Sequence, residues 1–447
     1  MSYEKYKLES PNLSLVDSEK VFASWGSKEE DFGKYFNKSN TPYLYWDKFR
    51  FGAPFKGLTL EESWLSVRRF RDIMLNETFL KAESGEPFKW IKLPNTDEFL
   101  HEIDMYTGGK VTAQAQSFEG DSKLIVRGIM EESIASSQLE GAHTTRCAAK
   151  KMLSEGRQPK NDSEQMILNN YRVMTMIDED FKGQDLSMDL MFEMHKLLTD
   201  GTLAVEEQGR LRKNDDDIVV SGMIGTEMYV SHVPPNEDFL AKEMERLVLF
   251  ANDKEDGGFT HPIIKAIFLH FWIGYLHPFT DGNGRLARAL FYWYLLKKGY
   301  WMMMYLPIST MIKKAPSQYS MAYIRTEQDS FDLTYFFEFN IKKIIASMAD
   351  FGDYLDRKLK ENKELDSILE EEEIVNDRQK SLLYYLLESD GASSTMTSHA
   401  ELNNISRQTA AKDLKILEDH GLLVSRREGK YTRYYASDGA KKLREKI

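Results

Sequence analysis

His277–Arg288, with the sequence HPFTDGNGRLAR, is the stretch that decides the fold and the chemistry of this chain. Gly282 and Gly284 flank a single asparagine, and glycines in a loop that opens a helix let the backbone approach an anion closely. The first turn of such a helix presents free backbone N–H groups and the positive end of the helix dipole, which together bind phosphate oxygens. The stretch therefore predicts a phosphate-binding loop.

The side chains of the same stretch predict phosphoryl-type chemistry. Arg285 and Arg288 are three residues apart, so on a helix they share a face and reach the same anion. Asp281 suits Mg²⁺, which takes only one or two protein carboxylates alongside phosphate oxygens. His277 titrates near neutrality and can accept a proton from an incoming hydroxyl, a role worth about 10²- to 10⁴-fold in rate.

Two other phosphate-binding motifs are excluded. GNGRLA also fits the variant dinucleotide fingerprint G-x-G-x-x-A, which requires a strand before it and an acidic residue about twenty positions after it. Residues 261–276 instead show helical spacing with Pro262 at a first helical position, and the later region reads WMMMYLPIS. No GxxxxGK[ST] sequence occurs, so the chain has no P-loop signature.

The stretch resembles the signature of the Fic family, HxFx(D/E)GNGRxxR, and every fixed position is filled. The resemblance implies a protein adenylyltransferase that transfers AMP from ATP to a Ser, Thr or Tyr hydroxyl of a target protein and of itself. It implies that His277 is the catalytic base, that Asp281 holds Mg²⁺, and that Phe279 anchors the loop in the core. The implied nucleotide-binding residues are Asp281, Gly282, Asn283, Gly284, Arg285, Arg288 and Tyr319.

A second motif concerns regulation. Ser136–Gly141 reads SSQLEG and resembles the inhibitory motif (S/T)xxxE(G/N) of Fic proteins, which predicts an inhibitory helix near residues 131–143 that contains Ser136. In relatives its glutamate pairs with the second arginine of the signature, here Glu140 with Arg288. A carboxylate in that place would occupy the site of the ATP γ-phosphate and prevent in-line transfer. The alternative is an ordinary helix with a solvated glutamate.

A β-rich run at residues 218–235 resembles the flap of Fic proteins. Gly222 and Gly225 are candidates for its hairpin turn. In relatives the flap aligns a target segment by strand addition, which reads backbone and tolerates varied sequences. The target-aligning residues would be Tyr229, Val230, Ser231 and His232. The alternative is a surface hairpin that only covers the bundle.

The sequence predicts a mainly α protein, with a Fic helical bundle, a β-hairpin flap and a C-terminal winged helix-turn-helix domain. The predicted domains are a family-specific extension at 1–120, the Fic domain at 121–355, a charged helical linker at 356–375 and the winged helix at 376–447. Apolar spacing predicts helices over 187–198, 238–251, 262–276 and 285–298. His195 and His270 are interpreted as core histidines, and Arg68, Arg69 and Arg71 as a solvated helix face.

In the C-terminal domain we expect helices at 377–387 and 398–402, a third helix after the N-cap Ser406, and a wing hairpin at 422–437. This domain has 13 Lys and Arg against 10 Asp and Glu, on a chain of net charge −12. Major-groove contacts would come from Arg407, Gln408 and Lys412, and phosphate contacts from Arg426, Arg427, Lys430 and Arg433. The domain therefore binds DNA or serves protein contacts such as homodimerisation.

Two rival functions stay open. One is a DNA-binding regulator whose Fic-like domain senses nucleotide, and the other is a Fic enzyme that uses another nucleotide or removes AMP. The target protein is unknown. One cysteine among 447 residues excludes an intrachain disulfide, and nine histidines show no zinc spacing. With no long apolar run we expect no membrane contact and a cytoplasmic location.

Overall fold

A computed structural model describes residues 5–26, 29–107, 122–224, 227–255, 258–371, 376–388, 392–403, 405–428 and 431–445. The predicted fold class is confirmed, since the protein is mainly helical with small sheets of two or three strands. The chain divides into two compact units, Met1–Ala349 and Asp350–Ile447. The first unit contains both the N-terminal extension and the HPFTDGNGRLAR loop.

The N-terminal extension is a packed region, as its aromatic content predicts. Its elements are α1 (Ser18–Gly26), α2 (Glu29–Asn40), α3 (Trp46–Phe49), α4 (Leu60–Met74), β1 (Asn76–Lys81), β2 (Pro87–Trp90) and α5 (Thr96–Thr107). Trp46 and Trp64 lie in an aromatic core that also takes in Ile324 and Tyr335 from the later part of the unit. Burial of this core ties the extension to the bundle.

The expected solvated arginine face on α4 is wrong for two of its three members. Arg69 is exposed, but Arg68 and Arg71 are buried. Arg68 forms an ion pair of 2.9 Å with Asp329, and the fully buried Arg71 donates to Asn40 Oδ1 at 2.8 Å. A buried guanidinium needs such acceptors, and their distance along the sequence hides them from a local pattern.

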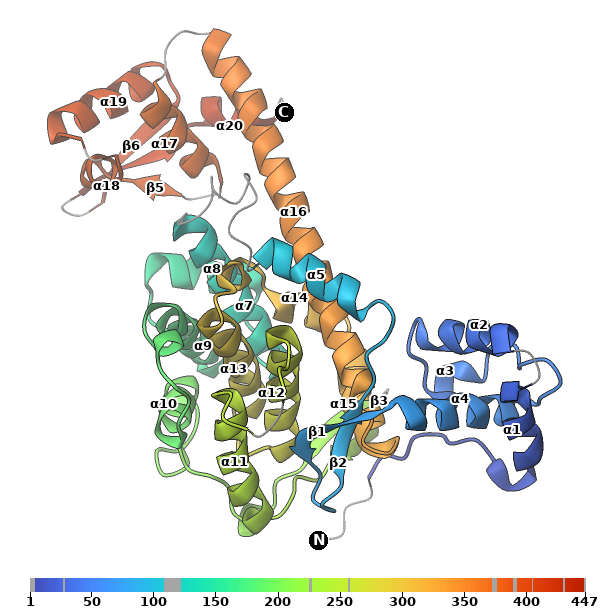
Figure 1. Cartoon of the computed structure of the whole chain (residues 1–447). Coiled ribbons are helices and arrows are strands. Elements are labelled where there is room, and N and C mark those ends of the chain that lie inside the picture. Colours follow the sequence, from blue (N-terminus) through green and yellow to red (C-terminus); the bar gives the residue numbers. More distant parts are fainter. Residues whose placement is uncertain are drawn as a thin grey trace. The chain divides into compact units, whose positions relative to one another are not determined.

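The helical bundle surrounds two central helices, α12 and α13 (Figure 1). Its helices are α7 (Ser122–Leu139), α8 (Arg146–Glu155), α9 (Asp162–Glu179), α10 (Met188–Thr199), α11 (Glu237–Ala251), α12 (Pro262–Leu276), α13 (Asn283–Lys297), α14 (Ile308–Lys313), α15 (Pro316–Gln328) and α16 (Thr334–Glu371). Both central helices are buried along nearly their whole length, which their apolar residues on all sides require. The four helices predicted here are confirmed to within two residues at each end.

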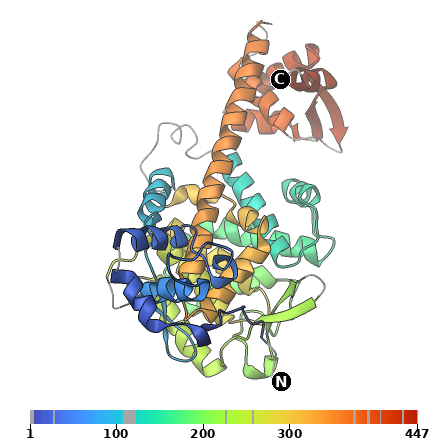
Figure 2. The same ribbon diagram turned by 90° about the vertical axis from the view of Figure 1, so that its right-hand side faces the viewer.

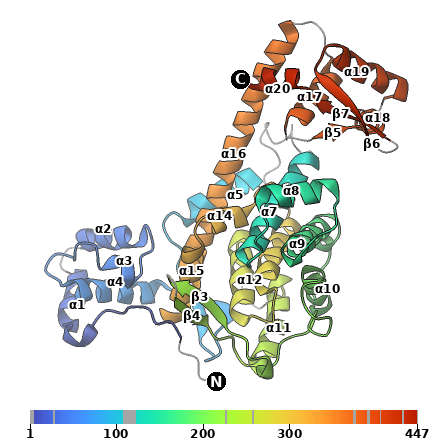
Figure 3. The same cartoon turned by 180° about the vertical axis from the view of Figure 1, so that it is seen from behind.

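The predicted hairpin is confirmed as β3 (Val220–Ile224) and β4 (Glu227–His232), which pair antiparallel beside α15 (Figure 3), and its role as a flap stays a prediction. Gly222 is not in the turn, because it lies within β3 opposite Tyr229. A Cβ on Gly222 would come within 2.5 Å of the Tyr229 side chain, so packing of that ring explains the glycine. Gly225, the other turn candidate, lies outside the described residues.

The second unit begins within α16, which Figure 2 draws as one uninterrupted orange helix. The boundary expected between 355 and 356 falls inside this helix, and residues 372–375 lie outside the described range. The unit continues with α17 (Asp377–Glu388), β5 (Ser393–Ser394), α18 (Met396–Leu402), α19 (Arg407–Asp419), β6 (Leu423–Glu428), β7 (Tyr431–Ala436) and α20 (Asp438–Glu445). Its sheet has the order β5-β7-β6, and Leu383, Leu414 and Leu417 lie in its own core. The three expected helices and the hairpin occur at their predicted positions.

Across the described residues, no helix combines the length and the apolarity that a bilayer crossing requires.

Candidate active site

The loop between α12 and α13 has left-handed backbone at both ends. His277 ends α12 with φ of 45°, and Gly282 is the N-cap of α13 with φ of 81°. Glycine adopts this conformation without strain, but a histidine needs support from its surroundings. The contacts at the end of α12 provide that support.

The carbonyl groups of residues 274–278, where α12 ends, are each satisfied. Most of the donors come from two side chains, Arg212 before the flap and His232 at the end of β4. The contacts are His277 Nδ1 to Gly274 O (3.4 Å), His232 Nε2 to Tyr275 O (2.7 Å), Arg212 Nη2 to Leu276 O (3.1 Å), Arg212 Nε to His277 O (2.7 Å) and the Arg212 N–H to Pro278 O (2.8 Å). Donors at a helix C-terminus satisfy orphan carbonyls, and a guanidinium also complements the helix dipole.

His277 is a neutral imidazole. Burial, together with the neighbouring His232 and Arg212, lowers the pKa of His277 to about 3. Its Nδ1 faces the Gly274 carbonyl oxygen, so Nδ1 carries the proton and Nε2 keeps its lone pair. A histidine in this form can act as a proton acceptor over the whole neutral pH range.

The middle of the loop is held by hydrogen bonds within the loop and by packing of a buried side chain. The Asn283 side chain accepts from the Phe279 N–H at 2.9 Å and donates to the Phe279 carbonyl at 2.7 Å, so any contact of Asn283 to an anion is left to its backbone. Phe279 is fully buried and stacks on His195 at 3.8 Å between ring centres. His195 accepts from the Gly209 N–H and donates to the Asp281 carbonyl, which confirms it as a core histidine.

Asp281 and Arg285 form an ion pair of 3.0 Å at the start of α13. Arg285 is fully buried and also donates to the Leu198 carbonyl at 2.8 Å, whereas half of the Asp281 side chain is exposed. Within the described part of the chain, no three His, Cys, Asp or Glu side chains group to hold a metal. A single exposed carboxylate beside an anion site fits Mg²⁺ that is bound mainly by phosphate oxygens.

The N-terminus of α13 is covered by Glu140. Its carboxylate lies so close to Gly284 that a Cβ there would be 2.1 Å from Glu140 Oε1. Glu140 Oε1 also pairs with Arg288 Nη2 at 2.9 Å, and Arg288 donates to Ser136 Oγ at 2.8 Å. Burial alone would lower the pKa of Arg288, but the charges of Glu140, Tyr319 and Glu132 and the hydrogen bond to Glu140 together raise it. The structure therefore brings together the residues of both predicted motifs.

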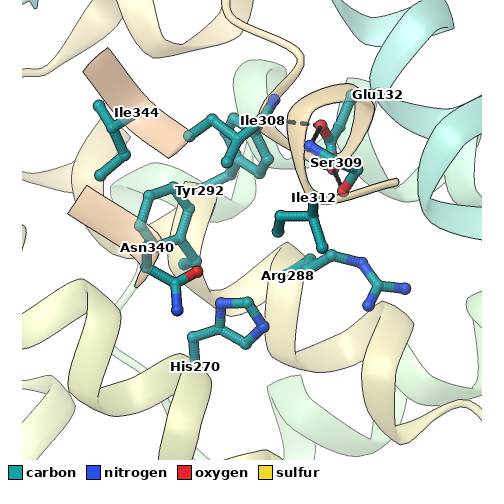
Figure 4. Close-up of a pocket in the computed structure, with 10 residues that line it drawn as sticks. Glu132, His270, Arg288, Tyr292, Ile308, Ser309, Ile312, Asn340 and Ile344 are labelled. Atoms are coloured by element: carbon teal, nitrogen blue, oxygen red, sulfur yellow. Dashed lines mark hydrogen bonds between the residues drawn. The ribbon is translucent and has the colours of Figure 1, made fainter. Parts of the chain in front are cut away.

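Glu132 is a site residue that the sequence analysis missed. It is buried one helical turn before Ser136 on α7, and burial raises the pKa of its carboxyl group. It accepts 2.9 Å hydrogen bonds from the Tyr292 hydroxyl of α13 and from the Ser309 N–H of α14 (Figure 4). The four-residue spacing of Glu132 and Ser136 was the available signal, since it places both on one face of α7, which ends just before Glu140.

A small cavity borders Arg288 and is lined mostly by apolar side chains together with Glu132, His270 and Asn340 (Figure 4). His270 lies 2.8 Å from the Tyr319 hydroxyl, and burial lowers the pKa of His270 to about 3. His270 is thus a neutral core histidine, as predicted. Tyr319 lies near Arg288.

The four predicted flap residues lie on β4 but have different neighbours. Tyr229 and Val230 contact the start of the chain, and Ser231 Oγ donates to the Val220 carbonyl at 2.9 Å. His232 Nδ1 lies 2.8 Å from a carboxylate oxygen of Glu327 on α15. Its Nε2 lies 2.7 Å from the Tyr275 carbonyl oxygen, so the ring joins β4 both to α15 and to the end of α12.

Known proteins resemble this chain over the same region. Residues 185–295 match the model of the Fic/DOC family. The protein adenylyltransferase Fic of Nematostella vectensis is 34% identical over 123 residues, which make up 27% of this chain and 25% of the relative. The protein of the same name from Drosophila melanogaster is 31% identical over 116 residues, or 26% of this chain and 21% of the relative. The chain thus spans about a quarter of the length of these curated relatives.

Solved structures with a similar chain include a Fic family protein from Desulfovibrio desulfuricans G20, with a TM-score of 0.47 and 19% identity over 77% of this chain and 96% of that one. Fic-1 from C. elegans gives a TM-score of 0.44 and 17% identity over 58% of this chain and 72% of that one. The site lies in a helical domain, in a loop between its central helices. This loop falls within the residues, 185–295, that match the Fic/DOC family model.

Proposed function

We propose that the chain is a protein adenylyltransferase. The target hydroxyl gives its proton to Nε2 of His277, and its oxygen attacks the α-phosphorus of ATP. A new P–O bond forms to the target, the bond to the β-phosphate breaks, and pyrophosphate leaves. One observation carries the proposal: a neutral histidine and an arginine-lined helix N-terminus stand at the two ends of one loop.

The binding residues act by position and charge. The N–H groups that open α13 and the guanidinium of Arg288 would hold phosphate oxygens, and Arg285 would keep Asp281 in place. Asp281 would hold Mg²⁺ together with those oxygens, and the bound ion supplies neutralisation of phosphate charge. The family domain and the names of the matched relatives support ATP as the nucleotide.

The described state is the inhibited one in this proposal. Glu140 takes the guanidinium that a γ-phosphate would need, so ATP would bind in a pose that does not align its α-phosphorus with the hydroxyl. Glu132 would position the inhibitory helix, because it joins α7 to α13 and α14. Release of Glu140 from Arg288 would then permit transfer.

Labelled ATP tests the proposal directly. Purified Glu140→Gly protein is incubated with Mg²⁺ and ATP labelled in the α- or the γ-phosphate, and protein-bound label is counted. We expect α-label on the protein itself or on an added target, no γ-label, and a rate about 10²- to 10⁴-fold lower when His277→Ala is added. Label from the γ-phosphate, or α-label that survives His277→Ala, would contradict the mechanism.

The same assay separates the neighbouring enzyme activities. Transfer from another labelled nucleoside triphosphate but not from ATP would assign a different donor. Release of AMP from protein that was modified beforehand, faster in wild type than in Glu140→Gly, would assign AMP removal instead. In that case Glu140 would position the attacking water rather than only exclude the γ-phosphate.

A second candidate function belongs to the C-terminal unit. Its order of elements supports a winged helix, and Arg407, Gln408 and Lys412 are all exposed on α19. On the hairpin, Arg426 and Arg427 are exposed on β6, and Arg433 pairs with Arg426 across the strands, while Lys430 lies outside the described residues. If this surface binds duplex DNA, affinity must fall steeply with salt.

The regulator hypothesis therefore has its own experiment. The full chain is titrated with duplex DNA over a range of salt concentrations, and the double variant Arg426→Ala/Arg427→Ala should show a slope shallower by about 2. Absence of salt-dependent binding would reject DNA as the partner and favour a protein contact for this surface. Neither result alters the assay of nucleotide transfer.

A further inference from the structure

The free edge of the flap strand β4 is occupied by the beginning of the chain. The Tyr6 N–H donates to the Val230 carbonyl at 2.8 Å, and Lys5 bridges Val230 in a parallel arrangement. β3 pairs with the other edge of β4. Residues 5 and 6 therefore extend the two-stranded flap on the side that β3 leaves open.

Two further contacts hold this segment. The Gln328 side chain accepts from the Leu8 N–H at 2.8 Å and donates to the Tyr6 carbonyl at 2.6 Å, so one amide pairs with the segment as a neighbouring strand would. Leu8 is buried in the aromatic core of the extension, and the Tyr6 ring packs on Tyr229 with ring centres 4.9 Å apart. The flap and its neighbours therefore contact this segment at its backbone and at the side chains of Tyr6 and Leu8.

Strand β4 is connected to the backbone that carries the proposed base. β4 ends at His232, whose ring contacts the carbonyl of Tyr275, two residues before the proposed base His277. An extended segment on β4 is consequently held along a strand whose end is joined to the backbone that carries His277. Strand addition at such an edge selects by backbone hydrogen bonds and by pockets for alternate side chains.

We propose that Lys5–Leu8 occupies, in cis, the edge of the flap on which target segments dock. The inference rests on the proposed transfer reaction for its meaning. It also names the target chemistry: an extended segment, parallel to β4, with an aromatic residue that packs on Tyr229 and an aliphatic residue two positions later. A target must displace the chain's own segment before it can be modified.

The binding of this segment to the flap is weak enough for a target segment to replace it. It includes one backbone and two side-chain hydrogen bonds, and each adds little net stability because water can replace the partner. Because the segment is tethered, it competes at an effective concentration that is on the order of millimolar for short flexible linkers. A free peptide of the same sequence would therefore bind poorly to the intact protein and well to a protein whose own segment is loosened.

The test uses a fluorescent peptide with the sequence of residues 1–12, and its binding is followed by anisotropy without nucleotide. Tyr6→Pro removes the N–H that bonds to Val230, and Gln328→Met removes both side-chain hydrogen bonds at similar size. Lys7→Pro is the matched control, because Lys7 is exposed and its N–H bonds to no acceptor in the described chain. Proline there also leaves the preceding residue extended.

We expect the peptide to bind at least tenfold more tightly to Tyr6→Pro and to Gln328→Met than to wild type, with Lys7→Pro like wild type. Equal binding to wild type and to both variants would overturn the inference. Peptide binding needs no transfer activity, so the two proposals fail separately. If the peptide discriminates but Glu140→Gly transfers no α-label, only the enzyme assignment fails.

Discussion

The two ends of the loop at residues 277–282 differ in how their backbone groups are satisfied. At the α12 end, the carbonyls of residues 274–278 all have donors, most of them from Arg212 and His232. At the α13 end, the N–H groups of residues 283–285 have no acceptor within the described chain, and the Glu140 carboxylate lies against Gly284. The carbonyls of one end all have donors, and the other end is covered by a single side chain.

This difference indicates that the two ends of the loop have different roles. The contacts at the carbonyl end hold the backbone of the proposed base His277 in its left-handed conformation. The amide end keeps its binding capacity for an anion, and Glu140 retains 27% side-chain exposure while Arg288 retains only 3%. Rigid placement of the base and exchangeable cover of the anion site are what a regulated transferase requires.

Removal of Arg212 takes away donors to the carbonyls at the end of α12. We expect this change to have the largest effect on stability. Arg212→Met leaves the carbonyls of Leu276, His277 and Pro235 without their donor, at about 1–3 kcal/mol for each buried group. We expect the free energy of unfolding to fall by at least about 3 kcal/mol. All seven tryptophans lie in the first unit, so their fluorescence during urea denaturation reports on this unit alone.

Arg210 provides the control for this change. It stands two residues earlier and pairs with Asp216 at the surface, where an ion pair contributes roughly 0–1 kcal/mol. Arg210→Met should therefore cost at most about 1 kcal/mol. If the two variants unfold at the same urea concentration, Arg212 does not hold the end of α12, and Arg212→Lys should then also resemble wild type.

Removal of Glu140 opens the other end. Loss of a charge-assisted hydrogen bond of about 1.5–3 kcal/mol frees Arg288 for the terminal phosphates, so the Kd for ATP should fall roughly 10- to 100-fold in Glu140→Gly. AMP lacks those phosphates, and calorimetric titration should show its Kd unchanged. Glu140→Gln still fills the space beside Gly284 and should fall between the two proteins. An equal gain for AMP and ATP would show that space, not Arg288, limits binding.

The sequence alone predicted the features that depend on local spacing or on a motif. Glycines, a proline at the start of α12 and apolar periodicity predicted the loop and the central helices, and the two Fic motifs predicted that Glu140 and Arg288 meet. These features follow from spacing along a helix or from a motif that fixes several residues at once. The C-terminal helices were predictable for the same reason.

The remaining features depend on partners that are distant in the sequence. Arg71 was expected in solvent because nothing near it shows that Tyr43 and Tyr335 surround its guanidinium. Gly222 was expected in a turn because a glycine that makes room for the Tyr229 ring has the same local signature. Glu132 was missed because its spacing from Ser136 indicates only a shared helix face, whereas the donors that bind its buried carboxylate come from two other helices.

The smallest expected effect concerns pH and the amide end, where His270 bonds to Tyr319 beside Arg288. Burial lowers the pKa of His270 from 6.5 to about 3, so between these values the unfolded chain binds the extra proton. Its contribution to stability is therefore complete above pH 6.5 and is lost as the pH falls.

His270→Gln keeps a hydrogen-bonding side chain but cannot titrate. Between pH 6 and pH 5 we expect wild type to lose about 1 kcal/mol more than this variant, measured by tryptophan fluorescence in urea. Equal losses in the two proteins would mean that His270 is not held neutral in the fold.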